Sequence, residues 1–138
     1  MGLFNRKPKT DYRPCGLDGF KFRNEKVRDR YLFLKRLQNQ GVISDLKVKP
    51  RFTIVPVLYG EIPEGKRKPV KLQRAYYYYG DFSYLKNGNL VVEDVKNKEG
   101  HLTSIYKLKK RLMMYFHQID VQEIYDATSW VNDSKKPR

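Results

Sequence analysis

Apolar residues recur at helical spacing in two segments of the chain. The first segment runs from about Asn24, a good N-cap residue, to about Gln40, and Gly41 then ends it. The second runs from about Thr103 to about His117. Their apolar stripes are Val27, Tyr31, Leu34 and Leu37, widened by Leu32 and Phe33, and then Ile105, Leu108, Leu112 and Tyr115 or Phe116. We expect two amphipathic helices whose stripes face the core.

Runs of β-branched and aromatic residues predict the strands. They lie at about Arg51–Leu58, Arg74–Leu85, Leu90–Lys96 and Asp120–Ile124. Pro56 favours an edge strand or a bulge, and residues 60–70 read as an exposed loop. Asn87-Gly88 is a strong signal for a hairpin turn. The order helix, three strands, helix, strand (αβββαβ) predicts a mixed α/β fold with a mixed central sheet flanked by helices.

The expected hairpin sets the register of two acidic residues. If the Asn-Gly pair forms a two-residue turn, Asp81 lies directly opposite Asp94, with the Cβ atoms roughly 4.5–5.5 Å apart. Lys96 shares the face of Asp94, whereas Glu93 points to the other face, because side chains alternate along a strand. Two carboxylates and an ammonium group should therefore converge on one patch.

Opposed carboxylates repel each other, so such a pair usually needs a cation between them. Oxygen ligands with little histidine suit Mg²⁺, and Mn²⁺ could substitute for it. A metal held there could polarise a phosphodiester, and Lys96 could orient the attacking water or stabilise charge. Charged residues are also common on hairpins, so geometry alone leaves a purely structural role open.

Composition narrows the class of partner. The 138 residues include 29 Lys and Arg against 15 Asp and Glu, a net charge of +14, which points to an anionic partner, most commonly nucleic acid. The single cysteine, Cys15, excludes an internal disulfide and a zinc site built on cysteine pairs. No apolar run is long enough to span a bilayer or to form a signal peptide, so we expect no membrane partner and a cytoplasmic location. The length fits one domain, expected at 19–128, between a basic arm at 1–18 and a basic tail at 129–138.

The segments GDF at 80–82 and VVEDVK at 91–96 resemble the paired motifs of the PD-(D/E)XK nuclease superfamily. Asp81 would be the acid of the first motif, and Asp94 and Lys96 the acid and lysine of the second. GVISDLKVKPRF and IYKLKKRLMMYF also resemble a family of small phage-encoded proteins in that superfamily. The resemblance covers about residues 19–125.

This resemblance implies a restriction-endonuclease-like core and magnesium-dependent cleavage of DNA, often in phage recombination or packaging. For a phage-encoded protein the location would be the host cytoplasm. Some relatives resolve branched DNA as homodimers, which leaves a homodimer open here.

The chain departs from the superfamily pattern in two places. Gly80 stands where the first motif carries a proline. Relatives often have an acid in the first helix that completes the metal site, and Val27 falls at that position. Glu25 or Asp29 could substitute, with Glu25 preferred for its place near the helix start. The implied metal ligands are therefore Asp81, Asp94 and Glu25.

Several basic residues and a tyrosine are candidates for contacting DNA. They are Lys107, Lys110 and Arg111 on the second expected helix, Lys66, Arg67 and Lys68 in the loop, and Tyr79, which faces Lys96 in this register. The lysines and arginines could bind phosphates, as flexible cationic loops do, although a solvated helix face would look the same. Packing is the alternative role for Tyr79. His101 follows the second motif and could approach a phosphate.

Two classes of function remain. The first is a metal-dependent DNA endonuclease that hydrolyses phosphodiester bonds, with Asp81, Asp94 and Lys96 as its catalytic residues. The second is a non-catalytic nucleic-acid-binding protein with a nuclease-like fold. The carboxylate pair favours the endonuclease, because a passive binder has no need of two acids in a basic groove, whereas Val27 argues mildly for the binder.

Overall fold

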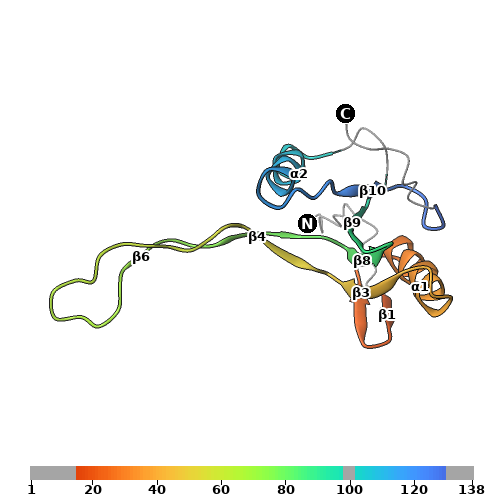
Figure 1. The fold of residues 1–138 in the computed structure, drawn as a ribbon, viewed down its shortest axis with the longest axis horizontal. Helices are drawn as coiled ribbons and strands as arrows, with labels where there is room; N and C mark the ends of the chain where they lie inside the picture. The colour runs from red at the N-terminus through yellow and green to blue at the C-terminus, as the bar shows by residue number, and fades with distance from the viewer. Residues whose placement is uncertain (1–14, 98–101, 130–138) are drawn as a thin grey trace, which may run out of the picture.

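A four-stranded mixed sheet forms the centre of the computed structural model, which describes residues 15–97 and 102–129 (Figure 1). Its strand order is β10-β9-β8-β3, with β10 parallel to β9 and the other neighbours antiparallel. These strands are β3 (Ser44–Val48), β8 (Phe82–Lys86), β9 (Asn89–Val95) and β10 (Gln122–Ile124). With helices α1 (Glu25–Asn39) and α2 (Ser104–His117), the core follows the predicted order of helix, three strands, helix and strand.

Both helices begin and end close to where the sequence predicted. The Asn24 side chain caps α1 by accepting a hydrogen bond from the backbone N–H of Val27 at 3.0 Å. Beyond α1, Gly41 has a φ of 77°, a backbone conformation that glycine adopts without strain. Thr103 caps α2 in the same way, with 3.1 Å to the N–H of Tyr106.

A long two-stranded ribbon projects from the sheet between β3 and β8 (Figure 1). It pairs β4 (Arg51–Val55) with β7 (Tyr76–Tyr79) and β5 (Leu58–Tyr59) with β6 (Lys71–Gln73). We call residues 50–79 the arm; the exposed loop predicted at 60–70 forms its tip.

Two strand predictions are wrong where the arm leaves the sheet. The expected strand Arg51–Leu58 is broken at Pro56 and lies in the arm. The strand that joins the main sheet is β3, which we did not predict. The expected strand Arg74–Leu85 is divided at Gly80, where the chain passes from the arm into the sheet. A Cβ atom on Gly80 would lie 3.0 Å from Cγ1 of Val92, so a larger residue there would crowd β9.

A short hairpin precedes α1. It consists of β1 (Cys15–Leu17) and β2 (Phe20–Phe22), which pair antiparallel through a turn at Asp18 and Gly19. The boundary that we expected at residue 18, between the basic N-terminal segment 1–18 and the domain, falls in this turn. Residues 1–14 and 130–138, which hold most of the two expected basic ends, lie outside the described residues.

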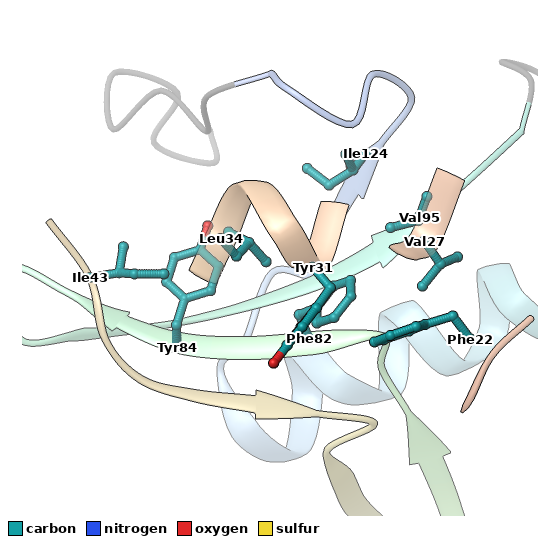
Figure 2. Packing of buried hydrophobic residues seen from close by; sticks show 9 residues of the cluster. All are labelled: Phe22, Val27, Tyr31, Leu34, Ile43, Phe82, Tyr84, Val95 and Ile124. Atoms are coloured by element: carbon teal, nitrogen blue, oxygen red, sulfur yellow. The ribbon is translucent and has the colours of Figure 1, made fainter. Parts of the chain in front are cut away.

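The two helices cover opposite faces of the sheet, because alternate residues of β9 contribute to two separate cores. The core under α1 comprises Phe22, Val27, Tyr31, Leu34, Ile43, Phe82, Tyr84, Val95 and Ile124 (Figure 2). The core under α2 comprises Ile54, Tyr78, Val92, Tyr106, Met113 and Val121. The predicted α1 stripe is confirmed for Val27, Tyr31 and Leu34, with Leu37 partly buried, but Leu32 is exposed.

The predicted stripe of α2 is wrong. Its members Ile105, Leu108, Tyr115 and Phe116 are exposed, and only Leu112 packs at the edge of the core. The helix instead buries Tyr106 and Met113. Apolar residues occupy more than one side of this helix, so periodicity alone could not decide which side meets the sheet. Within the described ranges, no helix is long and apolar enough to cross a membrane.

Candidate functional site

Asp81 and Asp94 come together where the arm enters the sheet. The predicted hairpin register is confirmed from Lys86 opposite Asn89 to Phe82 opposite Glu93. One residue further, the N–H of Asp81 donates to the carbonyl of Glu93 at 2.9 Å, which carries the register on to Asp94. Both aspartates are buried, at 8% exposure each, so each carboxylate needs partners that balance its charge.

Asp81 is held by two groups. The backbone N–H of Val95 donates to its Oδ2 at 2.7 Å, and the Arg23 guanidinium forms an ion pair with its Oδ1. Arg23 also donates to the carbonyl oxygen of Val95. Burial raises the pKa of the Asp81 carboxyl; Arg23 lowers it, but the charge of Asp94 raises it again.

Asp94 has different partners. The Tyr78 hydroxyl donates to its Oδ2 at 2.9 Å, and the Lys96 ammonium lies 3.2 Å from its Oδ1. Burial raises the pKa of Tyr78, so this hydroxyl keeps its proton and remains a donor. The Lys96 nitrogen also lies over the Tyr106 ring, 3.5 Å from the centroid, a cation–π contact that fixes its position. These contacts hold together the predicted group of Asp81, Asp94 and Lys96.

The start of α1 brings two further cations to the site. Arg23 precedes the N-cap residue, and the Lys26 ammonium donates to the carbonyl of Lys96 at 2.6 Å. The sequence reasoning missed Arg23, Lys26, Tyr78 and Tyr106. No sequence pattern marks these four residues, because their role depends on α1 and α2 packing against the ends of β9. Of the buried side-chain polar atoms in the described residues, the Tyr106 hydroxyl alone has no hydrogen-bond partner.

Glu93 points to the opposite face, as predicted. Its carboxylate accepts from Arg30 Nε at 2.7 Å and from the Tyr84 hydroxyl at 2.6 Å. Arg30 also donates to the carbonyls of Ala127 and Ser129. The Arg30 and Glu93 side chains are fully buried, so this ion pair lies in the core beneath the site rather than in it.

The third expected metal ligand is not brought to the two aspartates. Glu25 is exposed on the first turn of α1, and Val27 packs in the core. Among the described residues, no three His, Cys, Asp or Glu side chains group as metal ligands would. The site does offer oxygen donors, among them the two carboxylates and the Val95 carbonyl that Arg23 contacts.

The expected position of Tyr79 is wrong. It lies in β7 opposite Arg51, with an exposed ring, because the chain leaves the main sheet before reaching it. Its neighbour Tyr78 reaches Asp94 instead. A contact between Tyr79 and a nucleotide stays a prediction, now for a residue of the arm. His101 lies outside the described residues.

The basic candidates occupy two surfaces. Lys66, Arg67 and Lys68 are exposed at the tip of the arm. Lys107, Lys110 and Arg111 lie on α2, beside a groove of about 620 Å³ whose other wall carries Asp120 and Glu123. Lys107 and Arg111 are exposed, but Lys110 forms an ion pair with Glu123 at 2.7 Å, which partly neutralises it.

We expect Asp81→Asn to raise the thermal unfolding temperature of the metal-free protein by a few degrees at pH 7. Because burial raises the pKa of Asp81 above its ordinary value of 3.8, the folded state binds this proton more tightly than the unfolded state. The wild type therefore loses stability as the pH rises through the interval between the two pKa values. Asparagine removes that cost and still offers an oxygen to Val95 and Arg23.

Thermal melts from pH 3 to pH 8 test this, with the exposed Asp29→Asn as the control. The advantage of Asp81→Asn should vanish at the acid end. A variant that is less stable than the wild type at pH 8 but equal to it at pH 3 would mean that the ionised Asp81 is a net stabilising group.

Comparison with known proteins places the chain in a family without giving it an activity. No curated protein and no solved structure matches it significantly. The family model described as "Protein of unknown function (DUF1064)" matches residues 9–136. Since this match covers nearly the whole chain, the protein belongs to the DUF1064 family.

Proposed function

We propose that the protein is a divalent-metal-dependent DNA endonuclease whose catalytic residues are Asp81, Asp94 and Lys96. The observation that carries this proposal is the convergence of two buried carboxylates and a lysine at one end of the β8–β9 hairpin. The surrounding chain has a net charge of +14, which suits a polyanionic substrate.

The cost of this arrangement supports a functional origin. Burying charges is expensive, and the charge of Asp94 raises the pKa of Asp81 further. Packing alone would be served as well by apolar side chains of similar volume. Perturbed, partly buried titratable groups gathered in this way are typical of active sites.

The oxygen donors suit a hard divalent cation. Mg²⁺ is commonly held by one or two carboxylates and keeps several of its waters, so Asp81, Asp94 and the Val95 carbonyl are a sufficient set without Glu25. Arg23 bridges Asp81 Oδ1 and the Val95 carbonyl, which indicates that these two oxygens can share one cation. Mn²⁺ has similar ligand preferences and should replace Mg²⁺.

The residues of the chain then have separate tasks. A bound divalent ion would supply Lewis acidity and an activated water. Tyr78 fixes the orientation of Asp94 through its hydrogen bond of 2.9 Å. Lys96, held between Asp94 and the Tyr106 ring, presents a positive charge where negative charge develops on the phosphate.

The arrangement of the core agrees with this proposal. The order αβββαβ, with one acid directly before β8, the other near the end of β9 and the lysine two residues after the second acid, is what a restriction-endonuclease-like core would have. On this proposal the substrate is DNA, with branched or recombination-intermediate DNA in phage metabolism as one setting, and a homodimer is one way to act on two strands.

The test is incubation with linear, branched and single-stranded DNA in Mg²⁺, in Mn²⁺ and in a chelator. We expect strand cleavage only with a divalent ion. Binding without cleavage of any substrate in either ion would overturn the endonuclease and support the non-catalytic binder. That alternative is favoured by one observation, since Arg23 and Lys96 form ion pairs with the two carboxylates.

Neutralising the tip of the arm should weaken DNA binding. Each phosphate contact that Lys66, Arg67 or Lys68 makes contributes about −0.9 to the log–log salt slope on duplex DNA. Their combined replacement by alanine should therefore make the slope shallower by roughly 1–3 and lower affinity for unrelated sequences alike. Binding is measured from low to moderate salt without a divalent ion.

The matched control removes the same charge elsewhere. Lys21, Arg36 and Lys47 are exposed outside the arm and outside α2, so their triple replacement should leave the slope nearer to the wild type. Equal slopes for the two triple variants would mean that the arm does not lie along the DNA.

A further inference from the structure

Arg23 occupies the position that a metal would need. Its two terminal nitrogens contact Asp81 Oδ1 and the carbonyl of Val95. Both oxygens belong to the donor set of the proposed metal site. A guanidinium and a divalent cation compete for these oxygens, because two positive charges held this close together repel each other.

The two cations that pair with the aspartates differ in how firmly they are held. The Lys96 side chain is 21% exposed and lies on the Tyr106 ring, so it stays beside Asp94. The Arg23 side chain is 39% exposed, whereas Asp81 beneath it is only 10% exposed. Arg23 therefore covers the buried Asp81 carboxylate from the solvent side, and its side chain can move away without leaving a cavity in the core.

We propose that Arg23 is the resident counter-cation of this site: it neutralises Asp81 in the metal-free protein, yields Asp81 and the Val95 carbonyl to the divalent ion, and then binds a DNA phosphate. This inference rests on the proposed function. Neither the sequence motif nor the family match assigns a role to Arg23.

The surroundings of Arg23 favour a phosphate as its second partner. Lys26 lies at the same end of α1, with its ammonium 2.6 Å from the Lys96 carbonyl. Once released, the guanidinium stays on a basic edge beside the reacting phosphodiester. Metal and DNA then assist each other's binding, and this coupling is reciprocal.

The first test is calorimetric titration of Mn²⁺ into the protein without DNA, at pH 8 to keep Asp81 ionised. We expect Arg23→Gln to bind the ion at least about tenfold more tightly than the wild type. Arg23→Lys should lie between them, because a single ammonium can neutralise Asp81 but lacks the fork that bridges two oxygens. Arg28→Gln is the control, since Arg28 lies on α1 next to Asp29, 3.6 Å away on the surface.

The second test addresses the phosphate. In a Lys96→Met background, which should not cleave, Mn²⁺ should strengthen DNA binding. Adding Arg23→Gln should reduce that gain, because the released guanidinium is no longer there to meet a phosphate. A gain of the same size in both proteins would overturn the phosphate contact.

Metal affinity in Arg23→Gln equal to or below that of the wild type would overturn the competition. If that variant loses its fold by circular dichroism, the comparison of Arg23→Lys with the wild type decides in the same way. If the wild type cleaves DNA with a divalent ion but Arg23→Gln does not bind Mn²⁺ more tightly, only the role of Arg23 fails. If the wild type neither cleaves DNA nor binds Mn²⁺, the proposed function fails.

Discussion

Lys96→Met is expected to reduce metal-dependent DNA cleavage by at least about 10³-fold, the scale on which a single electrostatic group acts in such sites. Methionine retains most of the apolar stem that lies over Tyr106 but removes the charge beside Asp94. The fold and the DNA affinity should change little, because one charge in +14 is lost. The measurement is single-turnover cleavage with the enzyme in excess, together with binding in a metal-free buffer.

Lys109→Met is the matched control for this prediction. Lys109 also lies over an aromatic ring, that of Tyr76, at 4.9 Å from the centroid, but it has no contact with the two aspartates. Cleavage by this variant should stay within a few-fold of the wild type. Equal rates for Lys96→Met and Lys109→Met would remove Lys96 from the catalytic residues.

Arg30→Met is expected to lower the free energy of unfolding by about 3–5 kcal/mol, because it leaves the fully buried Glu93 without its partner. The Tyr84 hydroxyl would remain as a donor to that carboxylate but cannot neutralise it. The carbonyls of Ala127 and Ser129 would lose a donor as well. Denaturant unfolding in a metal-free buffer measures the change.

The double variant Arg30→Met with Glu93→Leu separates the charge from the packing. It should recover much of the lost stability, since a buried ion pair can often be replaced by apolar side chains at little cost. If Arg30→Met alone costs less than about 1 kcal/mol, the pair is not essential to the stability of the core.

Local features of the sequence were sufficient for part of the site. Asn87 and Gly88 specify a two-residue turn, and a turn of known length specifies every pair along the hairpin. The approach of Asp81 to Asp94 follows from that register. Asn24 and Thr103 likewise mark the helix starts, because capping depends on the next three residues only.

The arm shows where local reasoning stopped. The aromatic run before Gly80 reads as one continuous strand with the residues after it, since both halves have the same composition. Only pairing decides that Tyr76–Tyr79 meets β4 while Phe82–Lys86 meets β3 and β9. Tyr78 therefore reaches Asp94, and Tyr79, which we expected there, does not.

By itself the sequence determined the two helices, the hairpin, its register and the pairing of the two acids with a lysine, because each depends on residues close together in the chain. Tertiary structure alone decided that α2 buries Tyr106 rather than its regular apolar stripe, and that Arg23 and Arg30 balance the charges of Asp81 and Glu93. Those partners are separated by 58 and 63 residues. No local pattern encodes such contacts, since a buried charge is satisfied by whichever side chain the packed helices bring to it.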